Sequence, residues 1–212
     1  MKEPFAPGSR VLFYGDSITD WFRVKEDAGD LGHGYAARVA GVYRALFGEE
    51  VLFINRGVSG NRVGDLLERY EEDVLALRPD VISILIGVND TWRRYDRNDP
   101  TSAEIFEARY AQLLGRIRGD LPNCRIMMIE PFLLHEPADR WQWHEDLDPK
   151  RLAVCRLAQK YADWYLPMQG ILTEEVIRTH CRESSLLYDG VHPTEKGQAL
   201  LAVHILKTWG VL

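Results

Sequence analysis

The sequence contains few cysteines, no excess of basic residues and no long hydrophobic run, and each absence excludes a class of protein. Cysteine occurs only 3 times in 212 residues and never as a C-x-x-C pair, so we expect reduced, mostly buried thiols rather than a disulfide framework. The 26 Lys and Arg residues are outnumbered by 32 Asp and Glu residues, which gives a net charge of -6. This balance leaves no basic footprint for a nucleic-acid partner.

No uninterrupted apolar run approaches the ~18 residues that a membrane-spanning helix needs. The first residues, MKEPFAP, lack the apolar core of a secretory signal. We therefore expect a cytoplasmic protein without a membrane partner. No repeat, low-complexity tract or linker interrupts the chain, and 46% hydrophobic beside 27% charged residues is ordinary for a globule with a substantial core. The sequence thus predicts a single domain over residues 1–212.

Apolar runs alternate with segments of helical periodicity, as is typical of βαβ units around a parallel sheet. Strands are expected at 10–15, 51–55, 81–86, 124–130 and 164–167. Helices are expected at 34–47, 63–77, 103–119, 149–164 and 193–209. The predicted fold is a three-layer α/β/α sandwich with a five-stranded parallel sheet. Longer irregular stretches are expected to form the substrate pocket at the strand-end edge, and they span 18–33, 89–102 and 131–148.

Two motifs near opposite ends of the chain carry the residue types of acyl-transfer chemistry. Gly15-Asp16-Ser17 follows an apolar run, and the glycine permits a sharp backbone exit that presents Ser17 where open α/β sheets bind ligands. Asp189 and His192 stand three apart, so a turn places both on one face, where the carboxylate can orient the imidazole. A hydroxyl, a base and an orienting carboxylate are the minimum set for acyl transfer.

Two intermediate motifs follow the second and third apolar runs. They are GVSGN at 57–61 and GVND at 87–90. Loops that follow parallel strands converge on one edge of the sheet, so we expect the N–H of Gly60 and the side-chain amide of Asn89 beside the N–H of Ser17. These three groups would be the hydrogen-bond donors of an oxyanion hole. Apart from His192, the histidines show no compact metal-ligand spacing, so neither a metal nor another cofactor is expected.

The four motifs in this order resemble those of the SGNH hydrolases, also called the GDSL esterase/lipase family. The resemblance runs from Val11 to the last expected helix, and no residue of the four blocks is missing. It implies a flavodoxin-like fold, with Ser17 as nucleophile and Asp189 and His192 completing the triad. It also implies Ser17, Gly60 and Asn89 as oxyanion donors. Within the family, the blocks look most like those of bacterial carbohydrate esterases of the acetylxylan-esterase type.

Aromatic residues beside the motifs indicate the substrate. Flat aromatic faces suit sugar rings, although large aromatic residues also pack loops onto a core. The candidates for substrate binding are Trp92, Trp141, Trp143 and Tyr188, and similar acetylxylan esterases tend to have Trp where this chain has Tyr188. The stretch 131–148 is too mixed to form an apolar lipase lid, which favours short acyl groups.

We therefore expect a serine esterase that removes acetyl groups from xylo-oligosaccharides or related sugars through an acyl-enzyme. One alternative is a lysophospholipase or thioesterase that acts on longer acyl chains, because function resides in the loops of such a fold. A second alternative is a non-catalytic carbohydrate-binding protein. Similar acetylxylan esterases can be oligomeric, so the resemblance also leaves self-association open.

Overall fold

The computed structural model describes residues 3–212, so residues 1 and 2 of the expected domain lie outside the described part. Five strands form one sheet in the order β2-β1-β3-β4-β5, and every neighbouring pair is parallel. The strands are β1 (Arg10–Gly15), β2 (Leu52–Gly57), β3 (Val81–Leu85), β4 (Arg125–Ile129) and β5 (Trp164–Leu166). The five expected strands are thus confirmed, with ends that differ by at most two residues.

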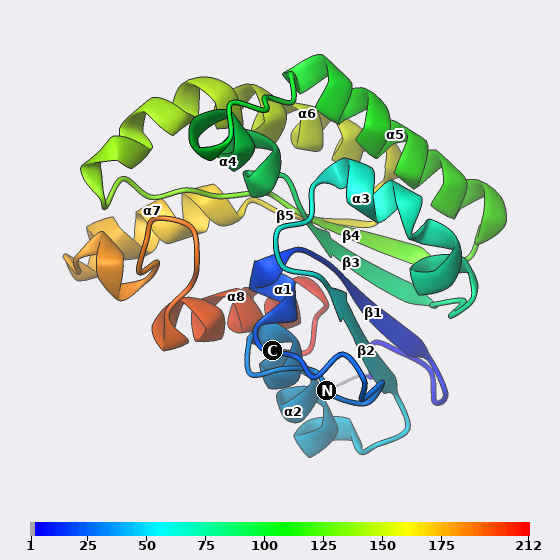
Figure 1. Ribbon diagram of the computed structural model, residues 1–212. Helices are drawn as coiled ribbons and strands as arrows, with labels where there is room; N and C mark the ends of the chain where they lie inside the picture. The colour runs from blue at the N-terminus through cyan, green and yellow to red at the C-terminus, as the bar shows by residue number, and fades with distance from the viewer. Residues whose placement is uncertain (1–2) are drawn as a thin grey trace.

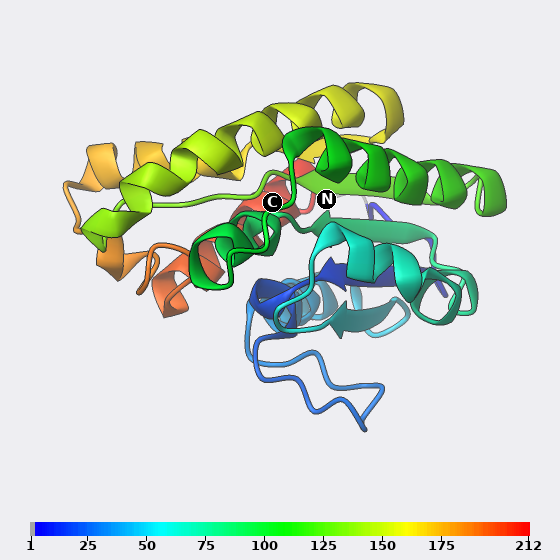
Figure 2. The ribbon, with the colours of Figure 1, turned by 45° about the horizontal axis from the view of Figure 1, so that its top comes forward.

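Helices cover both faces of the sheet, which confirms the three-layer α/β/α architecture (Figures 1 and 2). One face carries α2 (Tyr35–Phe47), α7 (Met168–Thr179) and α8 (Glu195–Thr208). The other face carries α3 (Val63–Glu68), α5 (Ala103–Asp120) and α6 (His144–Tyr161). Side chains of β1 alternate between the two cores, since Val11 and Phe13 pack on one face and Leu12 and Tyr14 on the other. Apolar strands buried on both faces explain the continuous apolar runs in the sequence.

Three expected helices begin or end more than one residue away from the expected position. The helix expected at 149–164 begins at His144, so Pro149 lies inside α6. Contacts with the rest of the fold hold this part of α6, since Leu147 is fully buried and Asp146 pairs with the buried Lys150. The helix expected at 63–77 ends at Glu68 and is followed by a π-helical turn, Glu71–Leu75. The side chain of Thr194 caps α8. The helix expected at 193–209 therefore begins at Glu195.

All three stretches expected to be irregular contain helical residues, and 18–33 begins within α1 (Ser17–Asp20). The stretch 89–102 begins within α4 (Val88–Asp96), so Asn89 lies in the first turn of a helix rather than in a loop. The stretch 131–148 contains a 3-10 helix (Ala138–Trp143) before α6. In addition, α7 is a separate helix that the sequence pattern does not predict. These differences leave the sheet unchanged but make the surroundings of the strand ends more ordered than expected.

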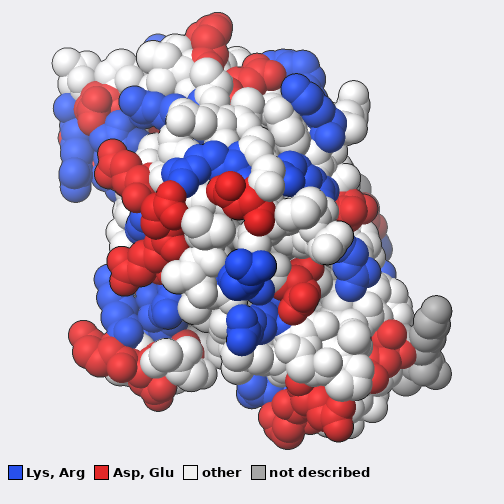
Figure 3. Space-filling view, turned by 90° about the vertical axis from the view of Figure 1, so that its right-hand side faces the viewer, with Lys and Arg blue, Asp and Glu red and all other residues white. Residues whose placement is uncertain are grey.

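The distribution of surface charge agrees with the expectation from composition, whereas the exposure of the cysteines agrees only in part. Lys and Arg are interspersed with Asp and Glu over the face that Figure 3 shows. Within residues 3–212, no helix is both long and apolar enough to cross a bilayer. All three cysteines are free, but only Cys124 is buried, whereas Cys155 and Cys181 are partly exposed. The expectation of mostly buried thiols is therefore wrong for two of the three.

Candidate active site

Ser17 is the first residue of α1 (Ser17–Asp20), a single helical turn that begins directly after β1. This turn packs tightly on the paired strand ends Gly15 and Gly57. A Cβ on Gly15 would lie 2.4 Å from Thr19 Oγ1, and one on Gly57 would lie 2.2 Å from the backbone nitrogen of Asp20. Only glycine leaves room for α1 at these two positions, so the glycines bring Ser17 to the edge of the sheet.

Ser17, His192 and Asp189 form one hydrogen-bonded chain, although 175 residues separate Ser17 from His192. Ser17 Oγ lies 2.9 Å from His192 Nε2, and His192 Nδ1 lies 2.7 Å from Asp189 Oδ2. The other carboxylate oxygen, Oδ1, accepts the backbone N–H groups of His192 at 2.7 Å and Val191 at 3.0 Å. The carboxylate of Asp189 therefore holds both the imidazole ring and the turn that carries it.

Electrostatics favour the ionised form of Asp189. Burial alone would raise the pKa of this carboxyl, but hydrogen bonds from the ring and backbone N–H of His192 and from Val191 outweigh it. They hold the pKa of Asp189 below its usual value. A carboxylate in this state accepts a hydrogen bond from Nδ1–H, which leaves Nε2 free to accept a proton from Ser17.

The groups expected to bind an oxyanion lie on neighbouring loops. Gly60 has φ of +85°, a conformation that glycine adopts without strain. Within residues 3–212, the N–H groups of Ser17 and Gly60 donate no hydrogen bond to the chain. Asn89 Nδ2 donates to the carbonyl oxygen of Asn61 at 3.1 Å, and its Oδ1 accepts from Arg93 Nη2 at 3.1 Å. The amide is thereby oriented, and its second N–H remains available as a donor.

Two buried carboxyls next to these residues act as helix caps. Asp16 Oδ1 accepts the N–H of Ile18 at 3.0 Å and so caps α1. Asp90 Oδ2 accepts the N–H of Val63 at 3.1 Å, at the start of α3. Burial raises the pKa of Asp16 and that of Asp90 to about 7 in each case, although these N–H groups favour the ionised form.

Tyr188 and Trp92, both expected to bind substrate, flank the imidazole of His192. The Tyr188 ring is stacked on it with centroids 5.6 Å apart, and the Trp92 ring is also 5.6 Å away but tilted. Tyr188 is 57% exposed, whereas Trp92 is only partly exposed. Both residues are therefore placed where the alcohol or acyl part of an ester bound at Ser17 can meet an aromatic ring.

The remaining two aromatic candidates lie farther from the reacting groups. Trp143 is 4% exposed and is stacked on Tyr95 with centroids 5.1 Å apart. The expectation that Trp143 contacts substrate is therefore corrected, because protein covers its ring. Trp143 packs against Trp92 instead. Trp141 is 64% exposed and is stacked on His135 at 3.7 Å. It leaves a free ring face on the rim of the site.

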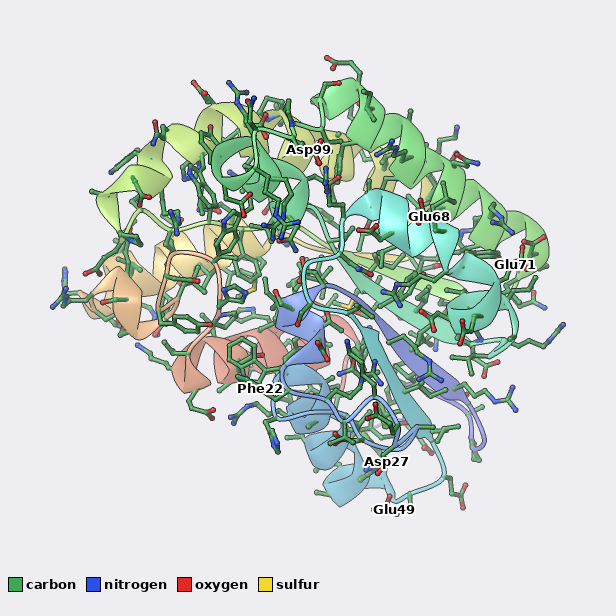
Figure 4. All side chains as sticks on the ribbon, viewed as in Figure 1. Phe22, Asp27, Glu49, Glu68, Glu71 and Asp99 are labelled. Atoms are coloured by element: carbon green, nitrogen blue, oxygen red, sulfur yellow. The ribbon has the colours of Figure 1, made fainter. Side chains whose placement is uncertain are left out.

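The sequence did not reveal three residues near the site. The Trp21 ring lies 6.4 Å from the rings of both Tyr188 and His192, and the adjacent Phe22 is 78% exposed beside α1 (Figure 4). Arg140 Nε donates to the carbonyl oxygen of Asp189 at 3.1 Å. The position of Trp21 just after the first motif is a signal that could have been used, whereas no local pattern marks Arg140.

Comparisons with known proteins agree with this architecture. The model of the GDSL-like lipase/acylhydrolase family matches residues 13–200. An acetylxylan esterase from Geobacillus stearothermophilus is 34% identical over 210 residues, which cover 96% of this chain and 94% of that protein. A candidate GDSL-like lipase from Parabacteroides merdae has a solved structure with a TM-score of 0.90, at 32% identity and 100% coverage of both chains. A catalytic mutant of an acetylxylan esterase from Geobacillus stearothermophilus gives a TM-score of 0.86 at 31% identity, covering 98% of this chain and 96% of that one.

The family model spans most of the chain, and two relatives above 30% identity cover nearly all of it. The chain therefore belongs to the GDSL-like lipase/acylhydrolase family, the SGNH hydrolases, as its four motifs predicted. It is a carboxylic ester hydrolase.

Proposed function

We propose that this protein is a serine acetylesterase that removes O-acetyl groups from xylo-oligosaccharides or related short glycans. The observation that carries the proposal is the hydrogen-bonded chain from Ser17 Oγ through the His192 ring to the Asp189 carboxylate, with distances of 2.9 and 2.7 Å. A serine hydroxyl is a weak nucleophile by itself, and an adjacent oriented imidazole is what activates it.

The proposed reaction has two steps. In the first, His192 Nε2 takes the proton of Ser17 as Oγ attacks the ester carbonyl, and Asp189 stabilises the imidazolium. The imidazolium then gives this proton to the departing sugar hydroxyl, which leaves acetyl-Ser17. In the second step, His192 activates a water that attacks the acetyl group, and acetate and free Ser17 result. The oxyanion of both tetrahedral intermediates would be bound by the N–H groups of Ser17 and Gly60 and by Asn89 Nδ2.

Two observations support a sugar ester as substrate. The acetylxylan esterase from Geobacillus stearothermophilus shares 34% identity with this chain and matches it almost end to end. The exposed ring of Tyr188 beside His192 offers a flat apolar face, and Trp92 offers a second. Pyranose rings present C–H faces of matching shape, so we assign Tyr188, Trp92 and the rim residue Trp141 to contacts with the glycan.

The test is acetate release from acetylated xylo-oligosaccharides by the wild-type protein, with a long-chain ester measured in parallel. Ser17→Ala is the matched blank and should lose activity by at least about 10⁴-fold. Turnover of only the long-chain ester would move the function to a lysophospholipase or thioesterase. No hydrolysis of either ester would favour a non-catalytic, carbohydrate-binding role. Undiminished hydrolysis by Ser17→Ala would contradict the assigned nucleophile.

A further inference from the structure

Arg69 connects the loops that carry the proposed oxyanion donors, although it belongs to neither of them. It is the C-cap residue directly after α3, and its side chain is 20% exposed. Nη2 donates to the carbonyl oxygens of Arg56 at 3.1 Å and Gly15 at 3.4 Å, and Nε donates to Asn61 Oδ1 at 2.7 Å. One guanidinium therefore binds the end of β1, the end of β2 and the residue that follows Gly60.

These contacts lead to the donors themselves. Gly15 precedes Ser17 by two residues, and its carbonyl oxygen also accepts the N–H of Val58 at 3.1 Å, which joins the first loop to the second. Asn61 extends the connection to the third motif, because its carbonyl oxygen accepts Asn89 Nδ2 at 3.1 Å. Each of the three motifs that carry a proposed donor is thus either bonded to Arg69 or one hydrogen bond away from it.

The guanidinium is itself held in a fixed orientation. Nη1 pairs with Asp73 one turn later in the chain, and Asp73 also pairs with Arg56 Nε at 3.4 Å. The Arg69 side chain lies over the ring of the buried Tyr14 of β1, 4.8 Å from the centroid. A planar group with five donors in a rigid fork can satisfy acceptors on three segments at once, whereas a lysine ammonium presents a single point charge.

We propose that Arg69 is a positioning residue that sets the geometry of the oxyanion hole. The inference rests on the proposed function, since it takes Ser17, Gly60 and Asn89 as the donors. Oxyanion donors accelerate a reaction because they are held in place before the charge develops, and a misplacement of about 1 Å can reduce a rate by about 100-fold. Without Arg69, the acceptor groups on these loops lose the side chain that holds them in fixed positions relative to one another.

Arg69→Met tests the proposal because it keeps most of the aliphatic stem and removes the guanidinium. We expect kcat for a small acetyl ester to fall about 10- to 100-fold, with KM changed by less than about threefold. Arg69→Lys retains the charge without the fork and should recover only part of this loss. An alkylboronic acid that forms a tetrahedral adduct with Ser17 should bind Arg69→Met more weakly, by the same factor as the loss in kcat/KM.

Arg116→Met is the matched control. Arg116 also pairs with a carboxylate, that of Glu71, and also covers a tyrosine ring, that of Tyr70 at 4.1 Å. Within residues 3–212 it donates no hydrogen bond to the loops of Ser17, Gly60 or Asn89. Its loss should lower the melting temperature without changing kcat. Since Arg69 acts partly through Asn61, Asn61→Leu should also lower kcat, and the double variant should lose less than the product of the two single losses.

Wild-type kcat and boronate affinity in folded Arg69→Met would overturn the proposal. So would a lower melting temperature, matched by Arg116→Met, without a fall in kcat, because that result describes a purely structural residue. If Arg69→Met does not fold, Arg69→Lys carries the same comparison. Failure of the proposed function is recognised separately, since it would appear as wild-type protein that releases no acetate from acetylated xylo-oligosaccharides or as hydrolysis that survives Ser17→Ala.

Discussion

The two sides of the site differ in how they are built around His192. One side, which we call the closed wall, consists of packed side chains that contact one another, namely Trp92, Tyr95, Arg140 and Trp143. The other, the open wall, consists of rings that meet solvent on one face, namely Trp21, Phe22 and Tyr188. Both walls touch the imidazole through an aromatic ring, so the difference concerns what covers those rings.

In the closed wall, each side chain is held by its neighbours. The guanidinium of Arg140 lies 4.1 Å from the Trp143 ring centroid and donates to the carbonyl oxygen of Asp189. The open wall is held under strain instead, since Trp21 and Phe22 have φ of +38° and +62°, values that cost bulky residues about 1–3 kcal/mol each. The N–H of His33 pins this turn by donating to the carbonyl oxygen of Trp21 at 3.0 Å. The closed wall therefore supports the turn that carries Asp189 and His192 and leaves only part of Trp92 exposed, whereas the open wall presents its rings to solvent.

Among the variants that bear on this comparison, the largest expected effect comes from Asn89, because every ester would use the proposed oxyanion hole whichever wall its groups contact. Asn89→Ala should lower kcat by about 10²–10³-fold, or about 3 kcal/mol of transition-state stabilisation, with less effect on KM. The loss should be equal for a small acetyl ester and for an acetylated oligosaccharide. Asn89→Asp, which has no N–H donor when ionised, should lose as much. A change of less than about threefold would remove Asn89 from the mechanism.

The next effect concerns Asp90, the neighbour of Asn89 at the start of α4, and appears in stability against pH. Burial raises the pKa of Asp90 to about 7 in the folded protein, whereas an unfolded Asp titrates near ~3.9. The folded state thus holds this proton between about pH 4 and 7, and stability falls as pH rises through that window. Asp90→Asn keeps an oxygen acceptor for the N–H of Val63 and removes the titration.

We expect Asp90→Asn to exceed wild type in unfolding free energy by about 4 kcal/mol at pH 8 and to match it near pH 4. Urea unfolding at pH 4, 6 and 8 measures the difference between the two proteins. Asp16 has a similarly raised pKa and is present in both, so it cancels in the comparison. A difference that does not change with pH would contradict the raised pKa of Asp90.

Arg140→Met breaks the closed wall alone. It removes a cation–π contact and a charged hydrogen bond to the carbonyl of Asp189, so stability should fall by about 2 kcal/mol. Because the catalytic turn loses its support, kcat should fall about 10-fold for all esters alike. Arg182, an exposed residue that pairs with Glu136, provides the control, and Arg182→Met should change both quantities little. A loss confined to oligosaccharides would show that Arg140 contacts the glycan instead.

The parts of this molecule that were predictable from sequence have local signals. Apolar runs followed by glycine-containing motifs placed Ser17 and Gly60 after parallel strands, and the spacing of Asp189 and His192 placed two side chains in one turn. The missed helices lack the local start signal, since α4 begins after Gly87 and α7 after Pro167, without a side-chain cap. α6 likewise has no side-chain cap, and its expected start was five residues late.

Contacts between distant segments gave no such signal. Lys150 is fully buried, and its ammonium binds Asp146 and also Thr91 Oγ1 at 3.2 Å, which joins α6 to α4. A lysine is usually exposed, so no reading of its neighbours predicts this burial. Arg69 and Arg140 belong to the same class, because their roles depend on which loops the fold brings to them. The residues that perform the proposed chemistry were thus easier to find than those that hold them.

The smallest expected effect tests the open wall. Phe22→Ala removes an exposed ring and leaves the same positive φ in a residue with a Cβ, so the turn is under the same constraint in both proteins. If the open wall meets the glycan, KM for acetylated xylo-oligosaccharides should rise about three- to tenfold, while kcat/KM for a small acetyl ester stays constant. Tyr188→Ala should act in the same direction and more strongly, because Tyr188 is stacked on His192. Equal losses on both substrates would mean that these rings support the catalytic turn as the closed wall does, and the contrast between the two walls would disappear.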